Sequence, residues 1–456
     1  MDRRSIVLVA ALALMTGCAG PNKLAERSEQ KLTGGDHWRA WELASRALQK
    51  EPSNVRARHA ASAAATVIAQ DWRKRIRALA DVDSVLAAEQ VLEFAAFRVR
   101  ALPLTVVAVD SSWAVEERLL RRSAARIRYR QAVAELESKR PKKAYLHFVD
   151  TDRFFPGYRD ATRLTVRAYE QALSRIAFVP LRAPGRPGLG REVAASWRDD
   201  VARGLQACRF TRILAGDALE RSMTVSQLDG IDREQAIALG RRAKVDRVVW
   251  GTIGGVDTDS RIQVFSETIA RRVVERDADG RETVRWVDVP LHVLARVRTV
   301  TVGLEYEVLA TRSGATLARH RGERTLHARA LWTAYVPEGG LDSYRLVPDP
   351  LRATQPRRAA EIETRWKAVA GDRTTLQQVL GARRATTGPA RWRRESASVF
   401  LPGGAGFVFL EELPPTEDLV FAVAAGGWEP LRDDLARLDE VDDADLDVVV
   451  ERSQSR

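Results

Sequence analysis

The apolar and polar positions of residues 231–256 predict a short helix that leads directly into a buried strand. Small and apolar residues recur at helical spacing and form one narrow face, at Ala236, Leu239, Gly240 and Ala243. Asp232 can cap the start of this helix, because Gln235 follows three residues later as in a capping box. Residues 248–250 form an apolar run typical of a strand that is covered on both faces.

The neighbouring residues predict a sheet covered by helices. Residues 176–181 and 210–214 are predicted strands. Between them an apolar stripe at helical spacing runs through Val193, Trp197, Val201, Leu205 and Cys208. The order strand, helix, strand, helix, strand favours an α/β core.

Two β-hairpins are predicted after this core. Residues 261–276 and 281–289 flank an Asp279-Gly280 pair, and residues 299–310 and 315–321 flank a turn at Ser313-Gly314. A strand that faces lipid needs one apolar face over about nine to eleven residues. Charge stands instead on both faces of the first hairpin, at Arg271, Arg272, Glu275, Arg276, Asp279, Arg285 and Asp288. The pattern therefore predicts a soluble hairpin and argues against a pore.

Two segments of the N-terminal third share one spacing. Intervals of four, three and five residues separate Ala40, Ala44, Ala47 and Pro52, and likewise Ala144, Phe148, Thr151 and Pro156. The spacing resembles the second helix of a tetratricopeptide repeat with its closing proline, because small residues let paired helices nest. The family's first-helix pattern is not evident, so an unrelated bundle stays open. A stack of such hairpins would offer a concave face to a peptide or partner, or would only pack on its neighbouring domain.

The first residues predict a cellular address. Arg3 and Arg4 precede an apolar run, residues 6–15, that is too short to span a membrane. Residues 14–19 resemble a bacterial lipobox, with Met15 where leucine is usual, which implies that Cys18 is acylated and becomes the mature N-terminus. Ala19 stands where aspartate would favour the inner membrane, so the resemblance implies the outer membrane. An ordinary signal peptide is the alternative.

Composition is that of a globular protein of 456 residues, 45% hydrophobic and 29% charged. The net charge of +12 would suit a nucleic acid or an anionic surface, but basic and acidic residues are interspersed as on ordinary solvated faces. If Cys18 is acylated, Cys208 has no partner for a disulfide. Its place on an apolar stripe predicts a buried small hydrophobe, not a reactive thiol.

The C-terminal third combines a basic segment, residues 352–394, with an acidic tail, residues 433–451. Trp366 and Trp392 are interleaved with the arginines, which predicts a surface for lipid head groups, for cell-wall polymer or for the acidic tail itself. Association of the basic segment with the tail is the simplest interpretation. Residues 399–401 and 407–410 predict a hairpin around a glycine loop, and no Gly-Lys-Ser/Thr motif follows as a phosphate loop requires.

Catalytic motifs are not found in the sequence. The six histidines include no His-x-x-x-His pair, no cysteine pair exists as a ligand set, and no Gly-x-Ser-x-Gly elbow occurs. The paired carboxylates Glu411-Glu412 and Asp442-Asp443 are predicted to be solvated. No catalytic, metal-binding or cofactor-binding residue is therefore predicted, and Cys18 is the one candidate site, for lipidation.

The core resembles the family of the curli secretion lipoprotein CsgG and its relatives, which include lipoprotein activators of peptidoglycan synthases. The resemblance covers about a third of the chain and is carried by residues 175–181, 236–240, 244–253 and 306–317. Ser313-Gly314 stands where the family usually has Thr-Gly or Asn-Gly. The family implies a periplasmic protein that is anchored in the outer membrane and works by assembly. Some of its members form a ring whose hairpins become a membrane barrel.

These observations predict a multidomain protein of class α plus α/β. Its parts are a lipoprotein signal peptide (1–17), a tether (18–35), helical hairpins like tetratricopeptide repeats (36–174), a sandwich-like CsgG-like core with a mixed sheet and β-hairpins (175–325), and a mixed C-terminal extension (326–456). The predicted function is that of a non-catalytic adaptor or assembly factor of a cell-envelope or secretion complex. A lipid anchor would hold it on the periplasmic face of the outer membrane. Envelope proteins or cell-wall polymer are its expected partners, nucleic acid is not, and a homo-oligomer is left open. The alternatives are a CsgG-type secretion channel subunit and a hydrolase of envelope polymers.

Overall fold

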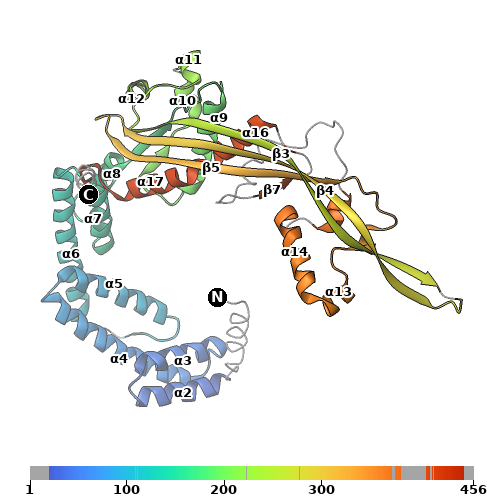
Figure 1. Ribbon diagram of the computed structural model, residues 1–456. Helices are drawn as coiled ribbons and strands as arrows, with labels where there is room; N and C mark the ends of the chain where they lie inside the picture. Colours follow the sequence, from blue (N-terminus) through green and yellow to red (C-terminus); the bar gives the residue numbers. More distant parts are fainter. Residues whose placement is uncertain are drawn as a thin grey trace. The chain divides into compact units, whose positions relative to one another are not determined.

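The computed structural model describes residues 20–107, 109, 111–221, 223–276, 278–371, 375–381, 407–410, 413 and 415–445. They form two compact units (Figure 1). The helical unit ends at Ala172 and regains the chain at Asp442, and the sheet unit comprises Leu173–Val441.

The helical unit is built from successive helices, each packed against the next along the chain. They are α2 (Pro21–Thr33), α3 (His37–Lys50), α4 (Val55–Ala80), α5 (Ser84–Ala101), α6 (Ser111–Glu137), α7 (Pro141–Phe154) and α8 (Ala161–Ala172). The small residues at the predicted spacing form packed faces, since Ala40, Ala44 and Ala47 on α3 are fully buried. The helical N-terminal region is thereby confirmed, and its resemblance to tetratricopeptide repeats stays a prediction.

The stretch predicted as a polar tether is instead helix α2. Pro21 occupies its first turn, where a missing N–H costs nothing. Leu24, Ala25 and Ser28 are buried on one side of the helix, and the Ser28 hydroxyl donates to the carbonyl of Ala40 at 2.7 Å. A short apolar stripe among many charged residues was enough to anchor this helix on α3 and α4.

The sheet unit contains one mixed sheet, as predicted. Among the described residues its strand order is β2-β1-β3-β4-β5-β7, and β6 also pairs with β3. The strands are β1 (Ser174–Phe178), β2 (Thr211–Ile213), β3 (Arg247–Arg276), β4 (Glu282–Ala310), β5 (Thr316–Thr333), β6 (Tyr344–Arg345) and β7 (Phe407–Leu410). β1 is parallel to β2 and β3, β3, β4 and β5 are antiparallel to one another in turn, and β7 is parallel to β5.

Helices cover the sheet in separate patches. They are α9 (Leu189–Gly204), α10 (Gly216–Glu220), α11 (Val225–Leu228), α12 (Arg233–Arg242), α13 (Asp349–Thr354), α14 (Pro356–Ala370), α15 (Leu376–Gly381), α16 (Thr416–Ala425) and α17 (Glu429–Glu440), with short 3₁₀ turns at Leu341–Ser343 and Gly426–Trp428. On α9, the Trp197 indole N–H donates to the carbonyl of Ala424 at 2.9 Å and thereby ties α9 to α16. Further along β4, Val293 and Leu291 form one core with Trp366 of α14.

The predicted unit at residues 231–256 is confirmed. Asp232 and Gln235 form the complete capping box of α12. Val248 and Val249 are fully buried. A Cβ on Gly240 would lie 2.5 Å from a methyl of Val248, so only glycine lets α12 approach β3 this closely.

The first predicted hairpin is much longer than expected, because β3 has 30 residues and β4 has 29 (Figure 1). Gly254 and Gly255 do not end the strand. Gly255 has a φ of +57° at a shift of the β3–β4 register between Gly254 and Asp257, which is a β-bulge with glycine in the left-handed region. β5 likewise runs through the predicted boundary at residues 325 and 326, so the C-terminal segment up to Val441 completes the sheet unit.

Candidate functional site

The predicted lipidation site, Cys18, lies outside the described residues. Cys208 lies within them and is half-buried, whereas the rest of its stripe, from Val193 to Leu205, is buried. Burial raises the pKa of the Cys208 thiol, and the carboxylates of Asp439 and Glu440 raise it further. The thiol therefore stays protonated at neutral pH, which disfavours a nucleophile at this position.

The described helices include none that is long and apolar enough to span a membrane. Within the same residues, His, Cys, Asp and Glu side chains do not gather in threes as a metal site would need.

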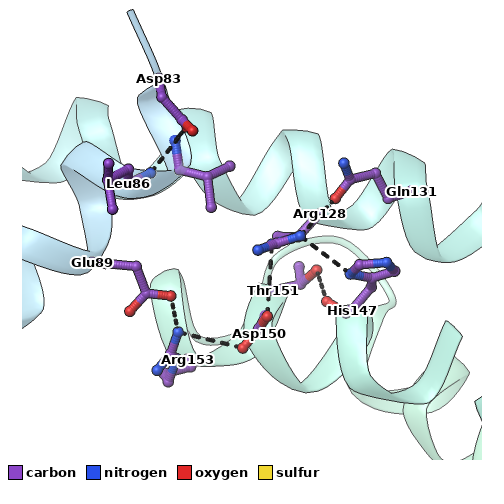
Figure 2. Close-up of polar contacts among 10 residues, drawn as sticks. Asp83, Leu86, Glu89, Arg128, Gln131, His147, Asp150, Thr151 and Arg153 are labelled. Carbon is purple, nitrogen blue, oxygen red and sulfur yellow. Dashed lines mark hydrogen bonds and ion pairs between the residues drawn. The ribbon is translucent and has the colours of Figure 1, made fainter. Parts of the chain in front are cut away.

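Figure 2 shows a polar network that joins three helices of the helical unit. The Arg128 guanidinium of α6 donates to Gln131 at 3.0 Å, and its Nε lies 3.6 Å from a carboxylate oxygen of Asp150 on α7. Arg153 of α7 lies 3.4 Å from Asp150 and also pairs with Glu89 of α5. The network thus links α5, α6 and α7 by charge beside an apolar cluster in which Ala88, Ala125 and Phe154 also join them.

His147 is the titratable centre of this network. Its Nδ1 lies 3.4 Å from a guanidinium nitrogen of Arg128, which makes it the acceptor of that contact. Burial lowers the pKa of His147, and the charge of Arg128 lowers it further. The ring is therefore neutral at pH 7, and its Nδ1 is free to accept from Arg128.

The start of α7 is capped from the far end of the chain. Asp442 accepts the backbone N–H groups of Lys142 at 2.9 Å and Lys143 at 3.2 Å, and it is 1% exposed. Asp445 accepts from Arg140 and from the Lys143 ammonium, each at 2.8 Å. Burial raises the pKa of Asp442, against the two N–H groups that favour its charged form. The prediction of a solvated Asp442 is wrong, because the open N–H groups of a helix start attract a carboxylate.

In the part of the basic segment that the structure describes, residues 352–371 and 375–381, the tryptophan is not on the surface as the sequence predicts. Trp366 is 6% exposed and belongs to the core under β3 and β4. Arg365 pairs with Glu267 of β3 at 2.5 Å. Trp392 lies outside the described residues.

Acidic residues of the C-terminal tail are bound elsewhere. Asp439 accepts the N–H groups of Arg209 and Phe210 at 3.0 and 2.9 Å, and Asp434 accepts the Tyr306 hydroxyl at 2.9 Å. Asp434, Asp439 and Asp442 of the tail thus accept hydrogen bonds from other parts of the protein. None of these bonds comes from the basic segment, with which the tail was predicted to associate.

Glu307 of β4 is the buried carboxylate of the sheet, at 2% exposure. It accepts from Arg233 at 3.1 Å and from Thr316 at 2.9 Å, and it lies 2.5 Å from Arg319. Burial alone would raise the pKa of Glu307, but the bonds from Arg233 and Thr316 and the charge of Arg319 together lower it. The bond to Arg233 links α12 to the sheet, and the lowered pKa keeps Glu307 ionised, which a general acid at neutral pH is not.

A cleft of about 770 Å³ lies beside the bulge of β3. Its walls come from the proline- and glycine-rich loop at residues 184–187, from Ile253–Val256 and from the start of α16. Glu192 and Glu417 line it together with Arg186. These are carboxylates without a nucleophile or an organised base, so the cleft has the chemistry of a polar recess.

Comparison of the chain with models of protein families, with curated proteins and with solved structures finds no match. The functional argument therefore depends on the residues and geometry described above.

Proposed function

We propose that the protein is an outer-membrane lipoprotein that acts on the periplasmic side as a non-catalytic adaptor or assembly factor of a cell-envelope or secretion complex. The observation that carries the proposal is Cys18, which follows a short apolar run in a sequence that resembles a lipobox. Acyl chains on this residue would hold the protein at a bilayer, since each buried CH₂ contributes about 0.8 kcal/mol.

Exposed apolar side chains on the helical unit support a role in holding a partner. Val115 and Leu119 lie one turn apart on α6, and each is 61% exposed. Val99 near the end of α5 is 72% exposed. Val115 and Leu119 together give α6 a small exposed apolar face that is available to a partner.

The test is crosslinking in membranes that contain the full chain. Wild type is expected to fractionate with the outer membrane and to capture a defined envelope protein. Cys18→Ala is expected to leave the membrane. The double variant Val115→Glu and Leu119→Glu should stay in the membrane and lose the partner, whereas Arg118→Glu on the same helix should keep it. Failure of wild type to reach the membrane, or to capture an envelope protein, would reject the adaptor.

A secretion channel subunit is the second candidate. The charged residues near the turn between β3 and β4 argue against it. Arg285 pairs with Glu275 at 2.8 Å, and Arg276 pairs with Glu282 at 2.9 Å, on strands that are exposed on both faces. A ring of defined size in mild detergent would favour the channel over the adaptor.

A hydrolase of envelope polymers is the third candidate, and the cleft with Glu192 and Glu417 is where it would have to act. Glu417→Gln is expected to leave function intact. Loss of function in this variant, with the fold unchanged, would favour the hydrolase.

A further inference from the structure

Strand β3 has a long open edge. On the side away from β4, β1 pairs with β3 only at residues 247–249, Arg182 bridges Thr252, and β6 pairs at Ala270 and Arg271. Among the residues that the structure describes, no strand pairs with this side of β3 between Ile253 and Ala270. An unpaired edge presents a row of N–H and C=O groups to any strand that can approach it.

Both faces of the strand are also uncovered in the middle of this segment. Every residue from Asp257 to Ile262 is exposed, and side chains of a strand alternate between the two faces of the sheet. Ile262 and Val264, two large apolar residues on one face, are 54% and 66% exposed. A Cβ on Gly254 or Gly255 would meet no atom within 4 Å. A strand can therefore reach the edge from either side.

The bulge decides which main-chain groups face the open side. Before the bulge, the main-chain groups of Gly251 and Ile253 point away from β4. The Gly251 carbonyl accepts from the Arg182 N–H, and the Ile253 N–H donates to the Arg182 carbonyl. The bulge inserts one residue into β3, while β4 continues without a break. From Thr258 onward the even-numbered residues therefore face the open edge, and the odd-numbered residues bond to β4.

We propose that this edge docks a second copy of the chain, whose own β3 pairs with it antiparallel about a two-fold axis at Ser260. The two sheets become one continuous sheet across the axis. Main-chain groups of Thr258, Ser260 and Ile262 supply the hydrogen bonds in both copies.

Charge favours this register over those centred on Thr258, Asp259 or Arg261. Centred on Ser260, each Asp259 stands opposite the Arg261 of the other copy, so two ion pairs form. A two-fold axis at Asp259 or at Arg261 would place that charged residue opposite the same residue of the other copy, so like charges would meet. Centring on Thr258 would oppose Asp257 to Asp259. Charged edge residues normally repel foreign strands, and here they tolerate the strand that carries the same sequence.

The opposite face of the joined strands gains apolar contacts. Each Thr258 stands opposite Ile262, and each Val264 reaches the Val256 of the other copy, so the two most exposed apolar residues of the strand leave water. The pairing needs residues 256–264, which lie between the Arg182 bridge at Thr252 and the Glu267–Arg365 pair. Beyond Val264 each β3 must diverge from the other copy, because β6 already pairs at Ala270 and Arg271. A two-fold contact consumes both edges, so it ends at two copies and does not grow into a ring.

Charge reversal tests the register in the full chain by sedimentation over a concentration series in mild detergent. Asp259→Arg alone and Arg261→Asp alone should each weaken dimerisation by about tenfold or more, because each replaces two attractions with two repulsions. The double variant should dimerise like wild type, because it exchanges the two charges. A mixture of the two single variants should form heterodimers although neither dimerises alone.

A cysteine at the axis gives a second, independent readout. In a Cys208→Ser background, Ser260→Cys should form a disulfide-linked dimer, since paired positions on adjacent strands lie within disulfide reach. Thr268→Cys, also exposed on β3, should not, because its two copies would lie roughly 50 Å apart at about 3.3 Å per residue. A monomer at all concentrations, or equal crosslinking at both sites, overturns the proposal. If Asp259→Arg instead abolishes capture of a different envelope protein, the edge belongs to that partner.

Discussion

The two halves of β3 both carry large apolar residues, and these residues have opposite surroundings. Val248 and Val249 in the first half are fully buried between β1 and β4, with Val248 under α12. Ile262 and Val264 in the second half are as apolar and mostly exposed. An apolar side chain alone does not decide which half is core. The elements that pack on the strand decide which half is core. After the bulge, residues 257–262 pair with β4 alone among the described strands.

Glycines mark the boundary between these halves, and they offer the largest expected contrast. A Cβ on Gly251 would lie 2.3 Å from the carbonyl oxygen of Glu305, a backbone atom that cannot move aside, whereas one on Gly254 would meet nothing within 4 Å. Gly251→Ala should destabilise the sheet unit by more than about 4 kcal/mol, and Gly254→Ala by less than about 1 kcal/mol. Urea unfolding of both variants checks this, and equal losses would mean that β3 is covered alike along its length.

Proline at two successive positions tests which side of β3 is open. The N–H of Asp259 is expected to bond to β4 and that of Ser260 to point to solvent. Asp259→Pro should therefore cost about 3 kcal/mol, and Ser260→Pro distinctly less, because proline removes a ladder bond only in the first case. The measurement is urea unfolding at a protein concentration low enough to keep the chain monomeric. A larger loss for Ser260→Pro would reverse the assignment of the open edge.

Local signals explain what the sequence predicts well. Helix α12 was predictable because its cap, Asp232 with Gln235, and its close approach at Gly240 are encoded within ten residues. The buried strand start at Val248 follows directly from the apolar run. Helix faces built on Ala40, Ala44 and Ala47 needed only their spacing.

Contacts distant in sequence explain what could not be predicted. Asp442 and Asp443 look alike in the sequence, yet Asp442 caps α7 across 300 residues. Gly254-Gly255 reads as a break between two strands, and only the continuous pairing with β4 turns it into a bulge. The open edge had a signal in Ile262 and Val264, which alternate with polar residues, but alternation does not tell which face lacks a cover.

Substitution of one valine by alanine in each half of β3 measures how much the burial of each half stabilises the fold. Val249 is 0% and Val264 66% exposed. Val249→Ala should cost about 2 kcal/mol, from lost burial and from the cavity left behind, and Val264→Ala should stay within about 0.5 kcal/mol in the monomer. Hydrogen exchange of the β3 amides locates the effect. At concentrations where two copies associate, Val264→Ala should instead weaken the dimer.

Glu307 and Glu305 of β4 provide the same comparison between a buried and an exposed position for a charged residue. We expect their substitution to change the free energy of unfolding least. Glu307 is buried with Arg233, Thr316 and Arg319, whereas the side chain of Glu305 is 38% exposed and lies 3.6 Å from Arg319. Glu307→Gln should cost about 1 kcal/mol at pH 7, because bonds to a charged acceptor become neutral ones, and Glu305→Gln should cost less than about 0.5 kcal/mol.

The contacts of Glu307 lower its pKa below the ordinary value of 4.5, so its charged form stabilises the fold fully above that pH. The loss in Glu307→Gln should accordingly shrink as the pH falls below 4.5 and through the lowered pKa of Glu307. Urea unfolding of wild type and both variants between pH 7 and pH 3 tests this, and a loss that did not change with pH would mean that shape, not charge, holds α12 on the sheet.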